Sequence, residues 1–341
     1  MNNVSNLTEL ESIAKVMVAP GKGILAADES LGTIEKRFVK ISVPSTEENR
    51  RAYREMLFTS PGIGKYISGV ILFDETIKQK TRGGVLFVKV LQNAGVIPGI
   101  KVDMGTKEME GSPNEKVTKG LDGLDGRLQE YVRLGAKFAK WRAIITIGDG
   151  LPTGANIRQN ARDLAIYALL CQKAGLVPMV EPEVLMDGAH TMERCEEVSR
   201  QTLSAVFEEL KRAGVAIPGM ILKTNMVVPG TMSGQNVRVE DVAAATVRLF
   251  KQVLPEELPG QAFLSGGQSE VEATENLNAI NKEGPFQWKL SFSYGRALQD
   301  SALKTWGGKE ENVAAAQQKF LHRARMNSLA TLGKYSGEVE V

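Results

Sequence analysis

The segment Phe138–Thr146 reads FAKWRAIIT, and its apolar, aromatic and β-branched residues predict a buried β-strand. A long helical pattern over Ala155–Ala174 follows and ends before Gly175, a common helix stop signal. A second apolar stretch, Val177–Val184 (VPMVEPEV), comes next. A strand, a helix and another strand in this order predict parallel neighbours joined by a right-handed crossover.

The same alternation of strand and helix extends along the chain in both directions. Eight strand–helix units predict an α/β protein with parallel strands in a closed (β/α)8 TIM barrel, and an open doubly wound sheet is the alternative. The six other predicted strands are Gly23–Asp28, Ile67–Phe73, Val96–Val102, Gly219–Asn225, Ala262–Gly266 and Leu290–Gly295. Further helices are predicted over Glu47–Phe58 with Thr46 as N-cap, Met192–Ala213 and Val239–Val253.

The chain is longer than the barrel requires. A TIM barrel needs about 250 residues, and the chain has 341. We assign the barrel to residues 20–300 and the surplus to helices outside it, one near Leu7–Met17 and one over Glu310–Leu332 in a C-terminal region of residues 301–341. There is no low-complexity linker and no second hydrophobic core, so a single domain over residues 1–341 is predicted.

The composition argues against several classes of protein. Forty-two basic residues against 40 acidic ones give a net charge of +2, with no general attraction to nucleic acid or anionic membranes. Two histidines cannot supply a three-imidazole zinc centre, two cysteines cannot build a disulfide framework, and no nucleotide-binding loop is evident. We therefore expect neither a metal nor another cofactor.

The cellular location of the protein is predicted from the absence of recognisable targeting or membrane-spanning segments. No apolar run is long enough to span a bilayer, and the N-terminus resembles neither a signal peptide nor a transit peptide. We expect a cytoplasmic protein, with the mature form of a plastid stromal protein as the alternative.

Polar side chains interrupt the predicted strands near their carboxyl ends. A strand buried in a parallel sheet is normally apolar throughout, and residues two apart lie on one face. A buried ion pair explains any one such residue, but seven strands together favour chemistry, because each unpaired buried charge is costly. In a TIM barrel this end is the active-site face. The residues are Asp28, Lys101 with Asp103, Lys140 with Arg142, Glu181 with Glu183, Lys223 with Asn225, Ser265 and Arg296.

Two glycine-containing loops follow the last two strands, Leu264–Ser269 (LSGGQS) and Ser291–Arg296 (SFSYGR). Glycines let backbone N–H groups approach an anion, and these loops are the usual phosphate site of the fold. The first loop alone also fits a simple turn, but Arg296 beside it favours phosphate. A second anion site is predicted across the barrel mouth, where a solvated helix face is the alternative. Its candidate residues are Ser30, Thr33, Arg37 and Lys101.

Lysine side chains at such a mouth can act covalently on a carbonyl group. A lysine amine becomes a nucleophile when burial or a neighbouring cation lowers its pKa. Lys223 and Lys140 both fit this description, and their spacing does not choose between them. Glu181 or Glu183 can carry the protons that expel water when an iminium forms. Asp28 can accept the hydroxyl proton whose loss starts carbon–carbon cleavage.

Six motifs occur in the same order as in one known family of enzymes. They are Pro20–Ser30 (PGKGILAADES), Phe138–Arg142 (FAKWR), Val180–Glu183 (VEPE), Leu222–Met226 (LKTNM), Leu264–Ser269 (LSGGQS) and Phe292–Leu298 (FSYGRAL). Together they closely resemble class I (Schiff-base) fructose-1,6-bisphosphate aldolases, from about Pro20 to Tyr335. The resemblance implies metal-independent, reversible cleavage of fructose 1,6-bisphosphate into dihydroxyacetone phosphate and glyceraldehyde 3-phosphate, in glycolysis and gluconeogenesis.

The resemblance assigns roles that the residue pattern leaves open. It implies that Lys223 forms the Schiff base and that Glu181 is the acid and base, with Glu183 supporting Lys223. It implies that Lys140 stabilises the carbinolamine and that Asp28 takes the hydroxyl proton. The implied phosphate contacts near the Schiff base are Ser265, Gly266, Ser293, Gly295 and Arg296. We add Gly267 and Arg142 as further candidate substrate-binding residues. The implied contacts near the distal phosphate are Ser30, Thr33, Arg37, Lys101 and Arg50.

The sequence departs from the family pattern in three places. Thr224 stands where the family commonly has proline, and Thr106–Lys119 is divergent. The last residues, Lys334–Val341 (KYSGEVEV), lack the tyrosine that ends the longer tail of many relatives, so we transfer no tail function to Tyr335. The resemblance also implies a homotetramer. Two other functions stay open, a relative active on sedoheptulose 1,7-bisphosphate and a non-catalytic sugar-phosphate-binding barrel or cytoskeletal adaptor.

Overall fold

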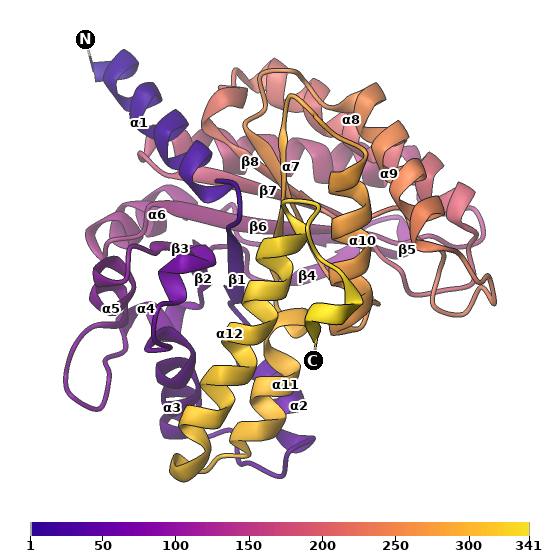
Figure 1. Ribbon diagram of the computed structural model, residues 1–341. Coiled ribbons are helices and arrows are strands. Elements are labelled where there is room, and N and C mark those ends of the chain that lie inside the picture. The colour runs from indigo at the N-terminus through magenta and orange to yellow at the C-terminus, as the bar shows by residue number, and fades with distance from the viewer. Residues whose placement is uncertain (1, 341) are drawn as a thin grey trace.

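Eight parallel strands form a closed barrel in the computed structural model, which describes residues 2–340 (Figure 1). In chain order they are β1 (Gly23–Ala27), β2 (Ile67–Leu72), β3 (Ile97–Lys101), β6 (Phe138–Ile145), β7 (Val177–Val184), β8 (Ile221–Thr224), β9 (Gly260–Phe263) and β10 (Lys289–Tyr294). Around the barrel the order is β1-β10-β9-β8-β7-β6-β3-β2, and β1 pairs with both β10 and β2. This closure confirms the predicted TIM barrel and excludes the open sheet. The predicted strands are all present, with ends that differ by at most three residues.

Helices connect the strands on the outside of the barrel. Three of them, α3 (Glu47–Phe58), α8 (Met192–Ala213) and α9 (Val239–Val253), have the predicted bounds. Thr46 Oγ1 accepts a hydrogen bond from Asn49 N at 3.1 Å, so the predicted N-cap of α3 is confirmed. The other helices are α1 (Asn2–Met17), α2 (Leu31–Val39), α4 (Asp74–Lys78), α5 (Phe87–Asn93), α6 (Leu124–Arg133), α7 (Gly154–Lys173), α10 (Glu270–Lys282), α11 (Arg296–Trp306) and α12 (Val313–Ala330). Short 3₁₀ segments occupy Ile63–Lys65, Ile217–Gly219, Glu310–Asn312 and Gly337–Glu340.

The inside of the barrel changes from apolar to charged along the strands. In β6, Phe138 belongs to the apolar layer at the amino ends, whereas Lys140 and Arg142 line a cavity nearer the carboxyl ends. Trp141, on the other face of the strand, belongs to the cluster between barrel and helices. The Phe138 ring requires a glycine opposite, because a Cβ at Gly99 would lie 2.2 Å from its Cζ atom.

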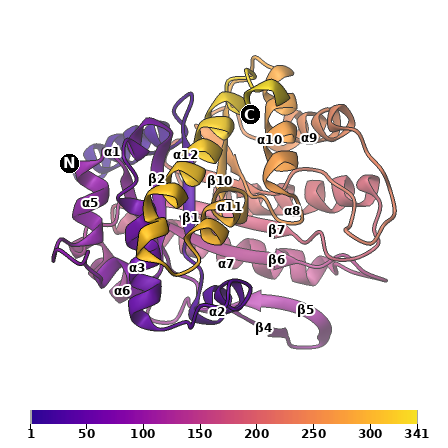
Figure 2. The same ribbon diagram turned by 60° about the horizontal axis from the view of Figure 1, so that its bottom comes forward.

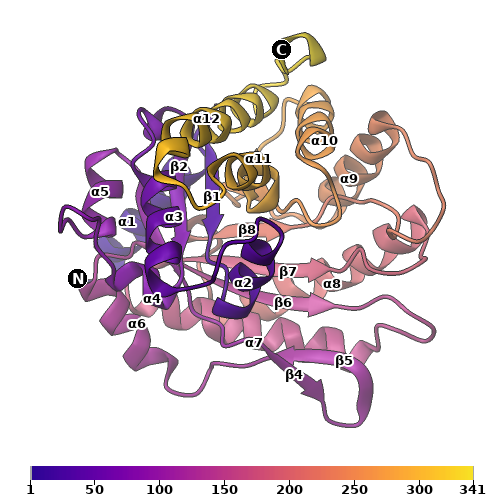
Figure 3. The same ribbon diagram turned by 90° about the horizontal axis from the view of Figure 1, so that it is seen from below.

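The amino ends of the strands are covered by α1. Leu10, Ala14 and Met17 of this helix pack against the apolar layer inside the barrel. In Figure 1, α1 lies at the upper left and α2 at the bottom, on opposite sides of the barrel. Figure 3, which views the molecule from below, shows α2 in front of the strands. The carboxyl ends of the strands therefore form the accessible mouth.

A two-stranded antiparallel hairpin was not predicted. It consists of β4 (Thr106–Met109) and β5 (Ser112–Thr118), within the segment described above as divergent, and it lies at the periphery of the molecule (Figure 3). Glu110 and Gly111 form its two-residue turn, with Gly111 at φ +76°. A glycine at this position was the sequence signal for the hairpin. Thr118 donates a hydrogen bond to the carbonyl of Arg142, which ties the hairpin to the barrel.

The C-terminal helical region is confirmed outside the barrel. Helices α11 and α12 pack against each other (Figure 2), and Glu340 in the last 3₁₀ segment forms an ion pair with Arg323 of α12. The single-domain assignment stays a prediction, and its end residues Met1 and Val341 lie outside the described residues. Within residues 2–340, the helices are all too short or too polar to cross a membrane.

Candidate active site

A cavity of about 920 Å³ opens at the carboxyl ends of the barrel strands. Its size is suitable for a small-molecule ligand. The predicted catalytic residues that form its wall are Asp28, Lys140, Glu181 and Lys223, which come from β1 or its end, β6, β7 and β8. Predicted substrate-binding residues on the same wall are Ser30, Thr33, Arg37, Lys101, Arg142 and Gly295.

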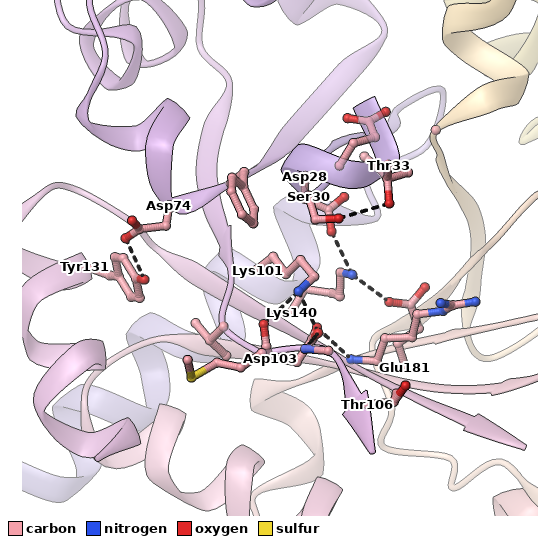
Figure 4. Close-up of a pocket in the computed structure, with 18 of the residues that line it drawn as sticks. Asp28, Ser30, Thr33, Asp74, Lys101, Asp103, Thr106, Tyr131, Lys140 and Glu181 are labelled. Atoms are coloured by element: carbon pink, nitrogen blue, oxygen red, sulfur yellow. Dashed lines mark hydrogen bonds and ion pairs between the residues drawn. The ribbon is translucent and has the colours of Figure 1, made fainter. Parts of the chain in front are cut away.

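Four charged side chains on the cavity wall form a continuous cluster, and Figure 4 labels three of them, Asp28, Lys140 and Glu181. Lys140 Nζ lies 2.7 Å from Asp28 Oδ2 and 3.2 Å from Glu181 Oε2. The other oxygen of Glu181, Oε1, lies 3.0 Å from Lys223 Nζ. The two lysine side chains are each only 5% exposed. The alternation of strand side chains thus brings acids and amines from four strands within hydrogen-bonding distance.

The charge state of this cluster follows from its contacts. Burial opposes ionisation of Asp28, but the ammonium groups of Lys140 and Lys223 outweigh burial and lower the pKa of Asp28. The pKa of Glu181 is lowered in the same way, against burial, by Lys140 and Lys223. Burial alone would lower the pKa of Lys140, but Asp28 and Glu181 outweigh it and raise that pKa. Near neutral pH, both carboxyl groups are therefore ionised and Lys140 is a cation.

Glu183 occupies a different position from Glu181. It lies outside the cavity wall, and its carboxylate forms an ion pair with the Arg142 guanidinium. On its other side, a Cβ added at Gly266 would lie 3.4 Å from Glu183 Oε1. Glu183 therefore holds Arg142 beside the first of the two predicted phosphate loops.

The two predicted phosphate loops lie next to the cavity, but most of their residues are not part of its wall. Gly295 is on the wall, and Arg296 is the exposed first residue of α11. Ser265 and Ser293 are buried, and Ser293 Oγ has no hydrogen-bond partner among the described residues. Gly267, at φ +73°, passes close to Met186, so a side chain there would be strained.

The residues predicted for the second anion site lie together on the cavity wall, with the exception of Arg50. Ser30 and Thr33 hydroxyl oxygens lie 3.0 Å apart at the start of α2, on the same wall as Arg37 and Lys101. Arg50 does not belong to this group. Its guanidinium forms an ion pair with Glu75 and donates to the carbonyl of Ser45, outside the cavity. The assignment of Arg50 to the substrate is therefore not supported by its position, because its donors already have partners on the protein surface.

Asn225 also lies elsewhere than the spacing suggested. β8 ends at Thr224, so the alternation of faces does not extend to Asn225. Its side-chain oxygen accepts a hydrogen bond from Val184 N at 3.0 Å, and its nitrogen donates to the carbonyl of Met226. Asn225 thus ties β7 to the chain after β8 and stays buried.

Several wall residues had no predicted role. Glu29 follows Asp28 in the first motif and forms ion pairs with two arginines. At the outer rim, the Tyr131 hydroxyl donates to Asp74 Oδ1 at 2.9 Å (Figure 4). The position of Glu29 beside a predicted catalytic acid was a usable signal, whereas nothing in the sequence linked Tyr131 to Asp74. Within residues 2–340, no three His, Cys, Asp or Glu side chains lie together as a metal centre would require.

Comparison with known proteins gives one consistent result. The family model described as "Glycolytic: Fructose-bisphosphate aldolase class-I" matches residues 9–341. "Fructose-bisphosphate aldolase 4, cytosolic" of Arabidopsis thaliana is 55% identical over 98% of this chain and 85% of its own length. "Probable fructose-bisphosphate aldolase class 1" of Xanthomonas campestris is 53% identical over 97% of this chain and 100% of its own length.

A solved structure supports the same relationship. The fructose-bisphosphate aldolase of Plasmodium falciparum, crystallised in complex with TRAP and a small molecule inhibitor, is 51% identical. It superposes with a TM-score of 0.97 over 98% of this chain and 96% of that chain. Sequence motifs, fold and cavity therefore agree with the comparisons.

Proposed function

The chain belongs to the class I fructose-bisphosphate aldolase family, and from this premise we propose that it cleaves fructose 1,6-bisphosphate through a Schiff base on Lys223. As an aldolase it is a carbon–carbon lyase. The products of the reversible reaction are dihydroxyacetone phosphate and glyceraldehyde 3-phosphate. The observation that carries the mechanism is the buried chain of contacts from Lys223 through Glu181 and Lys140 to Asp28.

The contacts support Lys223, rather than Lys140, as the nucleophile. Lys140 lies between two carboxylates, which raise its pKa and keep it protonated. A protonated amine has no free electron pair for attack on a carbonyl carbon. Lys223 contacts only one carboxylate, Glu181, among the described residues, and it can pass its proton to that oxygen at 3.0 Å. The Lys140 ammonium then serves as a fixed positive charge beside the developing carbinolamine.

Glu181 transfers a proton twice while the Schiff base forms. It first accepts the Lys223 proton, and the free amine adds to C2 of the ketose. One proton then moves from the nitrogen to the former carbonyl oxygen, which gives a neutral carbinolamine. Glu181 then gives a proton to the leaving hydroxyl group, so water departs and a cationic iminium remains. Because the carbinolamine is uncharged, Lys223 no longer lowers the pKa of Glu181 at that stage, and only the cations of Lys140 and Arg142 still do so. This favours a protonated Glu181 when an acid is needed.

Asp28 starts the cleavage step. As an ionised carboxylate it accepts the proton of the C4 hydroxyl group, and the C3–C4 bond breaks to release the aldehyde. The bonding electrons move to C3 and the iminium nitrogen, giving a neutral enamine. The proton that Asp28 took can return through Lys140, which takes it from Asp28 and gives one of its own to Glu181. Glu181 then protonates C3, which regenerates the iminium, and water hydrolyses the iminium to release dihydroxyacetone phosphate and free Lys223.

The two anion sites support a bisphosphate substrate. The family resemblance assigns Gly295 and Arg296, at the start of α11, to the phosphate near the Schiff base, and Arg37 lies on the cavity wall with Ser30 and Thr33. Backbone N–H groups at helix starts and guanidinium groups both bind phosphate. A seven-carbon ketose bisphosphate differs from fructose 1,6-bisphosphate only in the half that is released as the aldehyde. Measuring kcat/KM for both substrates shows which one the enzyme prefers.

The names of relatives support the setting of the reaction. Relatives from Arabidopsis thaliana and Spinacia oleracea are named as cytosolic and cytoplasmic isozymes. We therefore propose a cytoplasmic enzyme of glycolysis and gluconeogenesis. The homotetramer stays a prediction from the family resemblance.

Reductive trapping tests the proposed function directly. Sodium borohydride added with fructose 1,6-bisphosphate should reduce the iminium and attach a ketose phosphate to the peptide that contains Lys223. Peptide mass mapping after digestion reads the modified position. An adduct on another lysine would reject the assignment, and tight binding of the substrate without adduct or products would favour the non-catalytic barrel.

Replacing Arg296 by alanine should mainly weaken substrate binding. The variant loses a charge-assisted contact to phosphate, so KM should rise about tenfold or more while kcat changes little. Steady-state kinetics measure both values. Arg248→Ala is the control, because Arg248 is a half-exposed arginine on α9 paired with Glu196, outside the cavity wall. An unchanged KM for Arg296→Ala would contradict the phosphate role.

A further inference from the structure

Arg54 is a buried arginine directly behind the cavity. It lies on α3 with 3% of its side chain exposed, and it is not part of the cavity wall. Its Nη2 atom donates to Glu29 Oε2, but its Nη1 atom is buried without a hydrogen-bond partner among the described residues. An unpartnered nitrogen alone does not distinguish Arg54 from other buried arginines. What distinguishes Arg54 is its partner, because Glu29 lies on the cavity wall.

Glu29 is shared between two arginines. Its Oε1 atom accepts a hydrogen bond from Arg37, which lies on the cavity wall, and its Oε2 atom accepts one from Arg54. Burial opposes ionisation of Glu29, but Arg54 and Arg37 outweigh burial and lower the pKa of Glu29. One carboxylate between two guanidinium groups leaves a surplus of one positive charge. Because only Arg37 faces the cavity, an anion can use that surplus only there.

Further contacts fix the position of the Glu29 carboxylate between its two arginines. Gln299 of α11 donates through Nε2 to the Ala26 carbonyl of β1 at 2.8 Å and to Glu29 Oε1 at 3.2 Å. Tyr53, the neighbour of Arg54 on α3, donates its hydroxyl to Gln299 Oε1 at 3.0 Å. The helix that begins at Arg296, the strand before Asp28 and the helix of Arg54 are thus joined around one carboxylate.

We propose that Arg54 is a positioning residue for the phosphate group farther from the Schiff base. It holds Glu29 in place, and by sharing the charge of Glu29 it leaves the Arg37 guanidinium free to neutralise that phosphate. The inference rests on the proposed function, because it assigns Arg37 to the distal phosphate of the substrate. Arg54 itself touches no substrate.

A pair of substrates tests this role. Fructose 1-phosphate lacks the distal phosphate but forms the same Schiff base. Without the Arg54 charge, Glu29 neutralises Arg37 alone, so Arg54→Gln should lower kcat/KM for fructose 1,6-bisphosphate about 10- to 100-fold, mostly through KM. For fructose 1-phosphate the change should stay within about twofold. Arg54→Lys restores the charge without the planar guanidinium and should give an intermediate loss of about threefold for the bisphosphate only.

Arg323→Gln is the matched control. Arg323 of α12 has 5% side-chain exposure, pairs with Glu340 and also has a buried nitrogen without a partner, but it lies outside the cavity wall. Its substitution should leave the ratio of the two kcat/KM values unchanged. If Arg54→Gln lowered kcat/KM equally for both substrates, Arg54 would have only a structural role and the proposal would be wrong. If Arg54→Gln did not fold, Arg54→Lys would provide the test. An unchanged ratio of kcat/KM for fructose 1,6-bisphosphate to kcat/KM for fructose 1-phosphate in Arg54→Lys would also overturn the proposal. Wild-type protein that cleaved neither substrate would instead reject the proposed function.

Discussion

Lys223→Met should abolish cleavage of fructose 1,6-bisphosphate while the protein stays folded. Methionine has a similar length and no amine, so no iminium can form and the cleavage step loses its electron acceptor. We expect kcat/KM to fall by about five orders of magnitude or more, as for removal of other catalytic nucleophiles. Borohydride with substrate should then leave the peptide of residue 223 unmodified. Circular dichroism and thermal unfolding check that the fold is retained.

The matched control for Lys223→Met is Lys140→Met. Both side chains are 5% exposed and both contact Glu181, so the two substitutions remove a comparable buried charge. Loss of a fixed cation beside the carbinolamine should slow turnover by about 10²- to 10³-fold, yet the adduct on Lys223 should still form. If Lys140→Met abolished the adduct and Lys223→Met preserved it, the roles of the two lysines would be reversed.

The fold was largely predictable because its signals are local and repeated. Each strand of the barrel is a short apolar run followed by a helix with a recognisable stop, as in Phe138–Thr146 and the helix after it. The hairpin after β3 was missed because both strands are rich in polar residues and β4 is mostly exposed, so neither shows the apolar run of a barrel strand. Only the glycine in its turn marked it.

The candidate site was predictable where it depends on strand alternation. Lys140, Glu181 and Lys223 lie on the inner face of adjacent strands, and their spacing was enough to bring them together. Contacts made outside the strands were not predictable. Arg50 was assigned to the substrate by likeness to relatives, but its partner Glu75 comes from a helix after another strand, and the spacing of residues does not reveal such a pairing.

The choice between Lys223 and Lys140 needed three-dimensional contacts. Both are strand lysines in the sequence, and likeness to a family was required to prefer one. In the structure, Lys140 touches Asp28 and Glu181, whereas Lys223 touches only Glu181 among the described contacts. Lys140 thus has one more carboxylate neighbour than Lys223, and this difference supports different roles for the two amines. Three-dimensional contacts were also needed for Glu29, because its two arginine partners lie on two different helices, α2 and α3.

Asp28→Asn should stop the reaction after the Schiff base has formed. The amide has the size of the carboxylate and can still accept a hydrogen bond from Lys140, but it cannot take the C4 hydroxyl proton. We expect kcat for cleavage to fall by about 10²- to 10⁴-fold, the usual contribution of a general base. Formation of the iminium does not use Asp28, so trapping on Lys223 should continue.

The mass of the trapped adduct distinguishes this outcome from a general loss of activity. When Asp28→Asn is treated with fructose 1,6-bisphosphate and borohydride, the adduct on Lys223 should carry the whole six-carbon bisphosphate, because the C3–C4 bond stays intact. The wild-type protein should also give the three-carbon adduct, since the enamine returns to an iminium after the aldehyde has left. Asp163→Asn, a buried carboxylate on α7 outside this cavity wall, should behave as wild type. A three-carbon adduct in Asp28→Asn at the wild-type rate would mean that another group removes the hydroxyl proton.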